Sequence, residues 1–328
     1  MVAAGTKRKI KFWRYYQQWY ETYKLGDVAQ VTYNKYVLVG KKLKEIAPDL
    51  MLSNLTRTEL QKIINEYGRT HERQTVTDFY HHIGGAIRDA VYEGWIKRNP
   101  CYKIKMTSMV QHKDRRKWLE MEEVHKIEKV FDQDTTGFGD FFDFSMRTGT
   151  RFAETLAITP DDVDEQHLTV DINKSFNYKG VINTDDGKGF MPTKNKFSVR
   201  QLPIDYKALI DLKKHMDGLQ PNEPIWVHWW FSRPSYKNNW RGKKEIHNST
   251  FNHELAKMCK EAGVNRITVH GLRHTHASIL IANRVSVQTV AKRLGHADTE
   301  TTQKVYIHLL QSLENEDNNK IMSIMTGL

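Results

Sequence analysis

The stretch VHGLRHTHASILIANRVSVQTVAKRLGHADTETTQKVYIH, residues 269–308, decides how this chain is interpreted. It contains a His-x-x-Arg pair, His270 and Arg273, then Leu-Gly-His ending at His296, and Tyr306 ten residues later. Arginine offers a rigid fork of donors that matches two phosphate oxygens. Histidine exchanges a proton near neutral pH, and a tyrosine hydroxyl can act as a covalent nucleophile. Together these side chains suit the binding and attack of a phosphate diester.

A second arginine lies upstream in TGTRFAE, where Arg151 and Glu154 are three residues apart. We expect a helix here, and residues with that spacing share one helical face. Arg151 and Arg273 would then form a clamp of two guanidinium groups around one phosphate.

These segments carry a resemblance. TGTRFAETLAIT, HGLRHTHAS and LGHADTETTQKVYIH are similar, in order and approximate spacing, to the motif boxes of the tyrosine recombinase (phage integrase) family, including integrases of phages and integrative mobile elements. The resemblance implies a site-specific DNA recombinase that cleaves and rejoins strands through a 3′-phosphotyrosyl intermediate, for integration or excision of a mobile element. It covers roughly the last two-thirds of the chain.

The resemblance also implies a role for each matching residue. Arg151 and Arg273 hold the phosphate with a further hydrogen bond from His296, Tyr306 attacks, and His270 accepts its proton. The other implied participants are Glu154, which supports the first arginine without reacting, and a hairpin lysine that protonates the leaving 5′-oxygen.

The hairpin lysine is expected in MPTKNKFSVRQLPI. Lys194 aligns best with the family's position and Lys196 is its rival, with DNA contact as another role for Lys196. The two arginines supply the positive charge, so neither a metal nor another cofactor is expected.

Composition describes a polar globular protein. The 328 residues suffice for two domains, and no window approaches the roughly 18 apolar residues of a membrane helix. The N-terminus lacks the apolar segment of a secretory signal. Two cysteines, Cys101 and Cys259, do not suggest a disulfide framework, so a reducing cytoplasm is the expected location.

The net charge of +11 points to a polyanionic partner. Through His112 the chain has 19 Lys and Arg against 10 Asp and Glu, which leaves 31 against 29 for the remainder. The first third should therefore supply most of the sequence-independent contacts to DNA phosphates.

Hydrophobic spacing predicts four helices in that first third. Aromatic residues recur at three- and four-residue steps in Phe12–Tyr23, which predicts a helix whose aromatic face packs in a core. A second helix is expected over Gln30–Ile46, before Pro48. A third is expected to begin with Ser53–Thr56, and a fourth to run from Gln74 to about Glu93. By the resemblance, the second and fourth helices face the DNA major groove, with candidate contacts at Lys41, Lys42, Gln74 and Thr75.

The predicted fold is mainly α with a small antiparallel β-sheet, an α+β fold with a helical core-binding domain and a mixed catalytic domain. Strands are expected in HLTVDINKSF and FSVRQLPI. The expected divisions are a basic lead-in (1–11), the core-binding domain (12–101), a polar basic linker (102–117), the catalytic domain (118–310) and a C-terminal tail (311–328).

Three parts of the chain lie outside the matching motifs. The tryptophan-rich segment 226–240 departs from the family pattern, and core packing is favoured over a stacking platform for bases. The apolar residues of the tail would dock on a neighbouring protomer, or alternatively on the tail's own domain. Nothing before Phe12 could form the arm-binding domain of larger integrases, so either this member lacks that domain or the chain is truncated, and truncation is favoured.

The expected partners are double-stranded DNA core sites, a homotetramer on DNA formed from a monomer or weak oligomer, DNA-bending accessory proteins and an excision factor. Two other enzyme or protein classes compete: a type IB topoisomerase that relaxes DNA, and a non-catalytic DNA-binding protein on the same fold. A zinc site at His270, His274 and His276 is disfavoured, because no metalloprotease glutamate follows His270 and no third ligand is evident.

Overall fold

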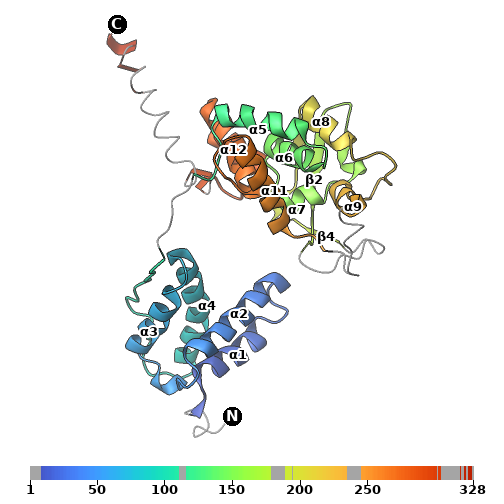
Figure 1. The fold of residues 1–328 in the computed structure, drawn as a ribbon. Helices are drawn as coiled ribbons and strands as arrows, with labels where there is room; N and C mark the ends of the chain where they lie inside the picture. Colours follow the sequence, from blue (N-terminus) through green and yellow to red (C-terminus); the bar gives the residue numbers. More distant parts are fainter. Residues whose placement is uncertain are drawn as a thin grey trace. The chain divides into compact units, whose positions relative to one another are not determined.

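The computed structural model describes residues 9–110, 116–178, 189–193, 195–234, 245–300, 302–303, 318, 321–322 and 324–326. The chain divides into two compact units, Met1–Asp114 and Arg115–Leu328, which are described separately below. Figure 1 shows the helices of the first unit in blue and teal, and those of the second from green to red.

In the described residues of the first unit, 9–110, there are four α-helices. They are α1 (Phe12–Tyr23), α2 (Gln30–Ile46), α3 (Arg57–Gly68) and α4 (Arg73–Tyr92), with a short 3-10 turn, η2 (Leu52–Asn54), before α3. The bounds of α1 and α2 are those predicted from sequence. Helix α3 begins after Thr56, whose side chain accepts a hydrogen bond from the Glu59 N–H.

The aromatic face of α1 is the centre of this unit's core, which confirms that interpretation. Its members Phe12, Tyr15, Tyr16, Trp19 and Tyr20 are buried. Trp19 Nε1 also donates to Asp89 at 2.6 Å, which joins α1 to α4. On α2, Leu43 is buried, whereas Leu38 is 60% exposed.

Most of the segment predicted as a linker packs against α3. Lys105 N donates to Gln61 Oε1 at 2.9 Å, and Met109 N donates to Gly68 O at 2.8 Å. Gly68 is required because a Cβ there would lie 2.1 Å from Thr107 O. Residues 102–110 therefore form part of the first unit.

The second unit is mainly helical. Its helices are α5 (Met121–Gln133), α6 (Phe138–Thr148), α7 (Phe152–Leu156), α8 (Tyr206–Lys213), α9 (Ile225–Ser232), α11 (Asn248–Glu261), α12 (Val269–Ala282) and α13 (Val287–Leu294). Glu120 and Glu123 form a capping box at the start of α5. Acidic side chains are favourable at this end of a helix because the helix dipole is positive there.

Within the described part of this unit, two small antiparallel sheets accompany the helices. The first has the order β1 (Val163–Asp164), β2 (Thr169–Ile172) and β5 (Arg200–Pro203), and the second pairs β3 (Lys174–Phe176) with β4 (Phe190–Pro192). A 3-10 turn, η4 (Lys196–Ser198), precedes β5. The mainly α fold with small antiparallel sheets is thereby confirmed.

Aromatic side chains of α6 and α9 fill the core of the second unit. Phe141 lies 5.3 Å from Trp226 and 4.8 Å from Phe251 between ring centroids. Trp229 and Trp230 are also buried. For these three tryptophans of the unusual segment, core packing is confirmed, while Trp240 lies outside the described residues.

Several predicted features cannot be located. Lys194, Tyr306, most of the tail and most of the basic lead-in lie outside the described residues. The described tail residues Ile321, Met322, Ile324 and Met325 are exposed. Over the part of the chain that the structure describes, no helix is long and apolar enough to span a bilayer.

Candidate active site

Arg151 lies immediately before α7, one position earlier than the helical placement expected from sequence. Helix α6 ends at Gly149, whose φ of 67° is left-handed, and the chain turns so that Arg151 has extended backbone (φ −74°, ψ 150°) at the N-cap of α7. A Cβ on Gly149 would lie 2.7 Å from His276 Cδ2, so this turn needs glycine.

Glu154 holds Arg151 from the first turn of α7. Its Oε1 accepts from Arg151 NH1 at 2.5 Å, and its Oε2 accepts from the Arg151 N–H at 3.1 Å. Burial alone would raise the Glu154 pKa, but the charges of Arg200, Arg151 and Arg273 lower it below its ordinary value. The carboxylate is thus ionised beside the arginines, in keeping with the supporting position expected for it.

Arg273 is buried on α12 and approaches the same place. Its NH1 donates to Gly149 O at 2.8 Å and its NH2 donates to Leu294 O at 2.6 Å. The acceptors are backbone carbonyls of the α6–α7 turn and of the α13 end. Both contacts fix the direction of the guanidinium without neutralising its charge.

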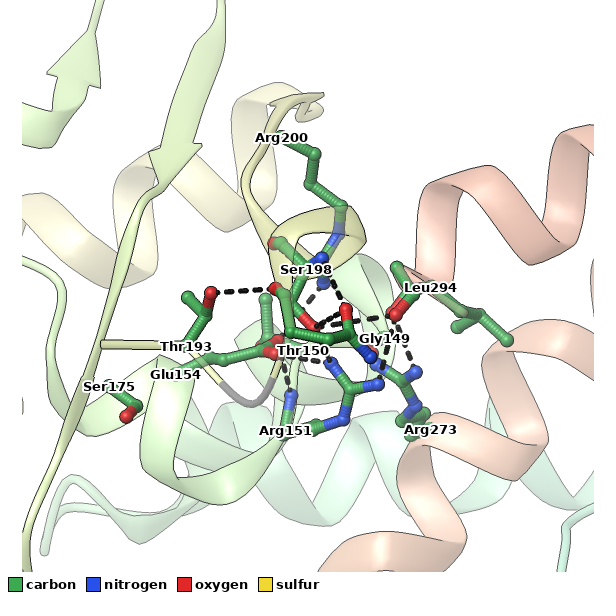
Figure 2. A network of polar contacts seen from close by, with 12 residues as sticks. Gly149, Thr150, Arg151, Glu154, Ser175, Thr193, Ser198, Arg200, Arg273 and Leu294 are labelled. Carbon is green, nitrogen blue, oxygen red and sulfur yellow. Dashed lines mark hydrogen bonds and ion pairs between the residues drawn. The ribbon is translucent and has the colours of Figure 1, made fainter. Parts of the chain in front are cut away.

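The last carbonyls of α13 accept from three arginines. Arg200 Nε donates to Arg293 O at 2.6 Å, Arg273 NH2 to Leu294 O, and Arg151 NH2 to Gly295 O at 3.1 Å. Figure 2 shows Arg151 and Arg273 converging on this end of α13 from different elements. A helix C-terminus carries unsatisfied carbonyls and partial negative charge, so it suits cations. This single helix end therefore gathers the predicted arginine clamp.

His296 follows the helix end directly. Its Nδ1 lies 2.7 Å from Thr302 Oγ1. Burial, together with the charges of Arg273 and Arg151, lowers the pKa of His296 to about 4. At neutral pH the imidazole is therefore uncharged.

His270 lies one helical turn before Arg273 on α12 and is exposed. Its ring centroid is 4.8 Å from that of His274. Burial and the neighbouring charges of His270 and Arg273 lower the pKa of His274 to about 4. Among the described residues, no three His, Cys, Asp or Glu side chains are grouped as ligands for a metal ion.

The structure thus brings together Arg151, Glu154, Arg273 and His296, with His270 on the neighbouring turn of α12. The sequence match is consistent with this geometry. Residues 117–312, more than half of the chain, match the phage integrase family.

The chain belongs to the phage integrase family.

Two proteins with similar sequences are both integrases. The chain is 26% identical over 305 residues to the ICEBs1 integrase of Bacillus subtilis (strain 168), covering 89% of this chain and 77% of the relative. It is also 26% identical over 303 residues to the integrase of Staphylococcus phage L54a, covering 86% and 83%. The chain is accordingly a tyrosine-type site-specific recombinase of the kind that integrates mobile elements.

Solved structures share the fold. The Tn1549 transposon integrase in complex with transposon right end DNA has a TM-score of 0.71 at 13% identity, over 94% of this chain and 99% of that one. The lambda integrase tetramer bound to a Holliday junction has a TM-score of 0.63 at 16% identity, over 90% and 80%.

Several site residues of this recombinase were not identified from sequence. Ser198 Oγ accepts from Arg151 NH1 at 3.1 Å, and Arg200 NH2 donates to Glu154 Oε2 at 3.1 Å. His276 is buried, with its pKa lowered to about 3 by burial and by the charge of Arg293, and its Nε2 accepts from Arg293 Nε at 2.9 Å. The hairpin motif contains Ser198 and Arg200, yet residue type alone did not distinguish them from solvated polar residues.

A groove with a volume of about 810 Å³ opens beside the site, between η4, β5 and α13. Arg200, Arg293 and His296 contribute to its lining. Lys196, the rival hairpin lysine, lines the groove from η4 and is exposed.

The candidate DNA contacts of the first unit are exposed. Lys41 and Lys42 lie on α2, where Lys42 pairs with Glu45 at 2.6 Å. Gln74 and Thr75 lie in the first turn of α4, where Gln74 donates to Asp78 at 3.0 Å. These positions are accessible to a ligand, and their role in DNA binding stays a prediction.

Proposed function

We propose that this recombinase cleaves DNA with Tyr306 as nucleophile and with Arg151 and Arg273 as the phosphate clamp. The observation that carries the proposal is the end of α13, where consecutive carbonyls accept from both guanidinium groups. Two arginines anchored on neighbouring backbone atoms can address one phosphate together.

The two arginines would stabilise the negative charge that makes a phosphodiester resistant to attack. An incoming oxygen meets a charged phosphodiester, and further charge develops on the equatorial oxygens in the pentacoordinate transition state. Fixed guanidinium donors stabilise that charge without having to reorganise. Both arginines are held by protein acceptors before DNA arrives, so little ordering remains to be done on binding.

The covalent step moves one proton at each end. The Tyr306 oxygen attacks phosphorus and gives its proton to His270, while the bond from phosphorus to the 5′-oxygen breaks. Lys194 protonates the departing 5′-oxygen, which leaves a 3′-phosphotyrosyl link and a free 5′-hydroxyl. The bond energy is retained in that link, so a 5′-hydroxyl from a second duplex can reverse the step without ATP.

His296 acts in this scheme as a neutral donor. Its low pKa keeps the ring uncharged, and a hydrogen bond from the Thr302 hydroxyl to Nδ1 would leave the proton on Nε2. Nε2–H can then donate to a non-bridging oxygen beside the arginines.

The first unit would serve as the core-binding domain, through the exposed faces of α2 and α4 and the basic surplus of its sequence. We propose assembly as a homotetramer on double-stranded core sites in the cytoplasm, supported by the similarity in fold to lambda integrase, which is solved as a tetramer on a Holliday junction. DNA-bending proteins and an excision factor would bias the direction of the reaction.

A nicked suicide substrate that carries the element's own core site tests the nucleophile. Wild-type protein should accumulate a covalent protein–DNA adduct, because the short 5′-hydroxyl fragment diffuses away. Tyr306→Phe should bind the same DNA with unchanged affinity and form no adduct, since only the hydroxyl is lost. An undiminished adduct from Tyr306→Phe would assign the nucleophile to another residue.

A further inference from the structure

Arg200 is an arginine with a largely buried side chain that the reaction scheme above does not use. Its side chain is 7% exposed at the start of β5. Nε donates to Arg293 O at 2.6 Å, NH1 to Ser198 O at 2.7 Å and NH2 to Glu154 Oε2 at 3.1 Å. The guanidinium thus joins three segments that are distant in sequence: the η4–β5 segment that contains Ser198 and Arg200, helix α7 and helix α13.

Arg200 shares two partner residues, Glu154 and Ser198, with Arg151. The Arg151 guanidinium donates to Glu154 Oε1, to Ser198 Oγ and to Gly295 O. Arg200 binds the other carboxylate oxygen of Glu154, the backbone carbonyl of Ser198, and Arg293 O, two residues before Gly295. Arg200 therefore holds Glu154 through its second oxygen, and it binds the backbone at Ser198 and two residues before Gly295.

We propose that Arg200 is a positioning residue for strand cleavage, which sets the location of the Arg151 guanidinium by fixing Glu154, Ser198 and the end of α13. The inference rests on the proposed function of Arg151 as a phosphate ligand. Arg200 acts through Arg151 and contributes no contact to the reacting atoms.

Electrostatics favours this division of labour. Glu154 is 3% exposed, and a buried carboxylate needs compensating charge. With Arg200 present, Glu154 divides its two oxygens between two guanidinium groups, so Arg151 neutralises only part of its charge. Without Arg200, the carboxylate would draw Arg151 toward itself, and the phosphate would face a displaced and more fully neutralised cation.

Single-turnover cleavage of the nicked suicide substrate, at saturating protein, tests the proposal. Arg200→Met should keep DNA affinity but lower the cleavage rate by roughly 100-fold, the scale on which a displacement of about 1 Å costs rate. If Arg200→Met is unfolded at the assay temperature, Arg200→Lys replaces it: it keeps a charge beside Glu154 but offers one nitrogen in place of three, and it should also be slow.

A second substrate separates positioning from loss of structure. A methylphosphonate at the scissile position has no negative charge and so depends less on a well-placed guanidinium. Arg200→Met and Arg151→Met should both lose less rate on the methylphosphonate than on the phosphodiester. A general loss of active protein would lower both rates by the same factor.

Arg147→Met is the matched control. Arg147 is also a well-paired arginine of this unit, bound to Asp143, Asp205 and Glu128 at 2.7–3.0 Å, and it shares none of Arg151's side-chain partners among the described residues. This variant should melt at a lower temperature yet cleave both substrates at the wild-type ratio.

The outcomes are distinct. Wild-type cleavage by Arg200→Met, or equal losses on the two substrates, would overturn the inference while leaving the clamp intact. Normal phosphodiester cleavage by Arg151→Met would instead overturn the proposed function. In a Glu154→Gln background the further loss caused by Arg200→Met should shrink, because the residue through which it acts has changed; full additivity would also count against the inference.

Discussion

At the scale of single residues, we propose that a threonine six positions further along the chain determines which nitrogen of His296 carries the proton. Thr302 is fully buried, and its hydroxyl lies 2.7 Å from His296 Nδ1. Because the imidazole is neutral at pH 7, only one of its nitrogens carries hydrogen. A hydroxyl that donates to Nδ1 selects the form that can donate from Nε2.

Thr302→Val should therefore slow cleavage. The isosteric side chain removes the donor, so the proton can move to Nδ1 and the Nε2 donor is lost in part of the molecules. We expect a fall of roughly 10- to 100-fold in single-turnover cleavage, since loss of one whole transition-state donor costs about 10²–10³. Thr302→Ser keeps the hydroxyl and should cleave within a few-fold of wild type. Equal rates for the valine and serine variants would show that Thr302 does not select the tautomer.

The residues found from sequence are those that we propose to bind the phosphate, while most of the residues that hold them in place were missed. Arg151, Arg273 and His296 were predicted because their chemistry and spacing match a reaction. Arg200 and Thr302 act on protein atoms, and a polar residue in one sequence gives no sign of whether its partner is protein or water. One signal was available for Arg200: strand alternation puts it on the same face as Leu202, which is buried.

At the scale of elements, the end of α13 depends on Gly295. Its φ is 69°, and a Cβ there would lie 2.9 Å from Ser198 Cα and 3.0 Å from Arg200 NH1. Because residue 295 has no side chain, the η4–β5 segment can lie against the backbone carbonyls at the end of α13 that accept hydrogen bonds from the arginines. A side chain would have to push the hairpin and the helix end apart.

Gly295→Ala should lower both stability and activity. The left-handed backbone costs about 1–2 kcal/mol for a residue with a Cβ. The displaced hairpin should also lower the cleavage rate, by about 10-fold or more, because it carries Ser198 and Arg200. Thermal melting and suicide-substrate cleavage measure the two effects.

Gly263→Ala is the control for backbone strain alone. Gly263 has a similar φ of 64°, but nothing lies within 4 Å of a Cβ built there. This variant should lose comparable stability and keep its cleavage rate. If the two alanine variants cleave equally well, the close approach at Gly295 has no part in the reaction.

Long helices were predicted better than short connections. The bounds of α1 and α2 follow from apolar periodicity, with Pro48 just beyond α2. Helix α7 has only five residues, so Arg151 was expected inside it although it lies at the N-cap. The left-handed turn at Gly149 decides this position, and a Thr-Gly-Thr sequence is compatible with several turns.

At the scale of the whole molecule, a buried acidic pair makes stability depend on pH. Asp143 and Asp211 join α6 to α8, with side chains 2% and 0% exposed, and Lys207 Nζ lies 3.4 and 3.1 Å from them. Asp211 Oδ2 accepts no hydrogen bond from the described residues. Burial and the charge of Asp143 raise the pKa of Asp211 to about 7.

Asp211→Asn should flatten the pH dependence of unfolding. Between pH 4 and pH 7 the folded protein keeps the Asp211 proton, while the unfolded carboxyl, with its ordinary pKa of 3.8, has lost it. The folded state binds more protons than the unfolded state in this range. Raising the pH therefore lowers the contribution of Asp211 to the free energy of unfolding. We expect roughly 1–2 kcal/mol of this effect, or about 2–8 °C in melting temperature, to be absent in the variant. Parallel melting curves for the two proteins across this range would refute the raised pKa.

The boundary between the two units was predicted from composition only in part. The boundary after Asp114 lies within the polar basic segment predicted as a linker. However, nine residues of that segment, 102–110, attach to α3, mainly through hydrogen bonds to backbone groups such as Lys105 N and Met109 N. Backbone groups are the same for every residue type, so composition does not record where they bind.

The arrangement at the end of α13 also bears on protein engineering. Arg293, Leu294 and Gly295 receive the three arginines through main-chain oxygens. Substitution at position 293 or 294 changes a side chain but retains the oxygen, whereas inserting or deleting one residue shifts the whole row out of register. A mutational library at this helix end should accordingly vary residue identity and preserve segment length.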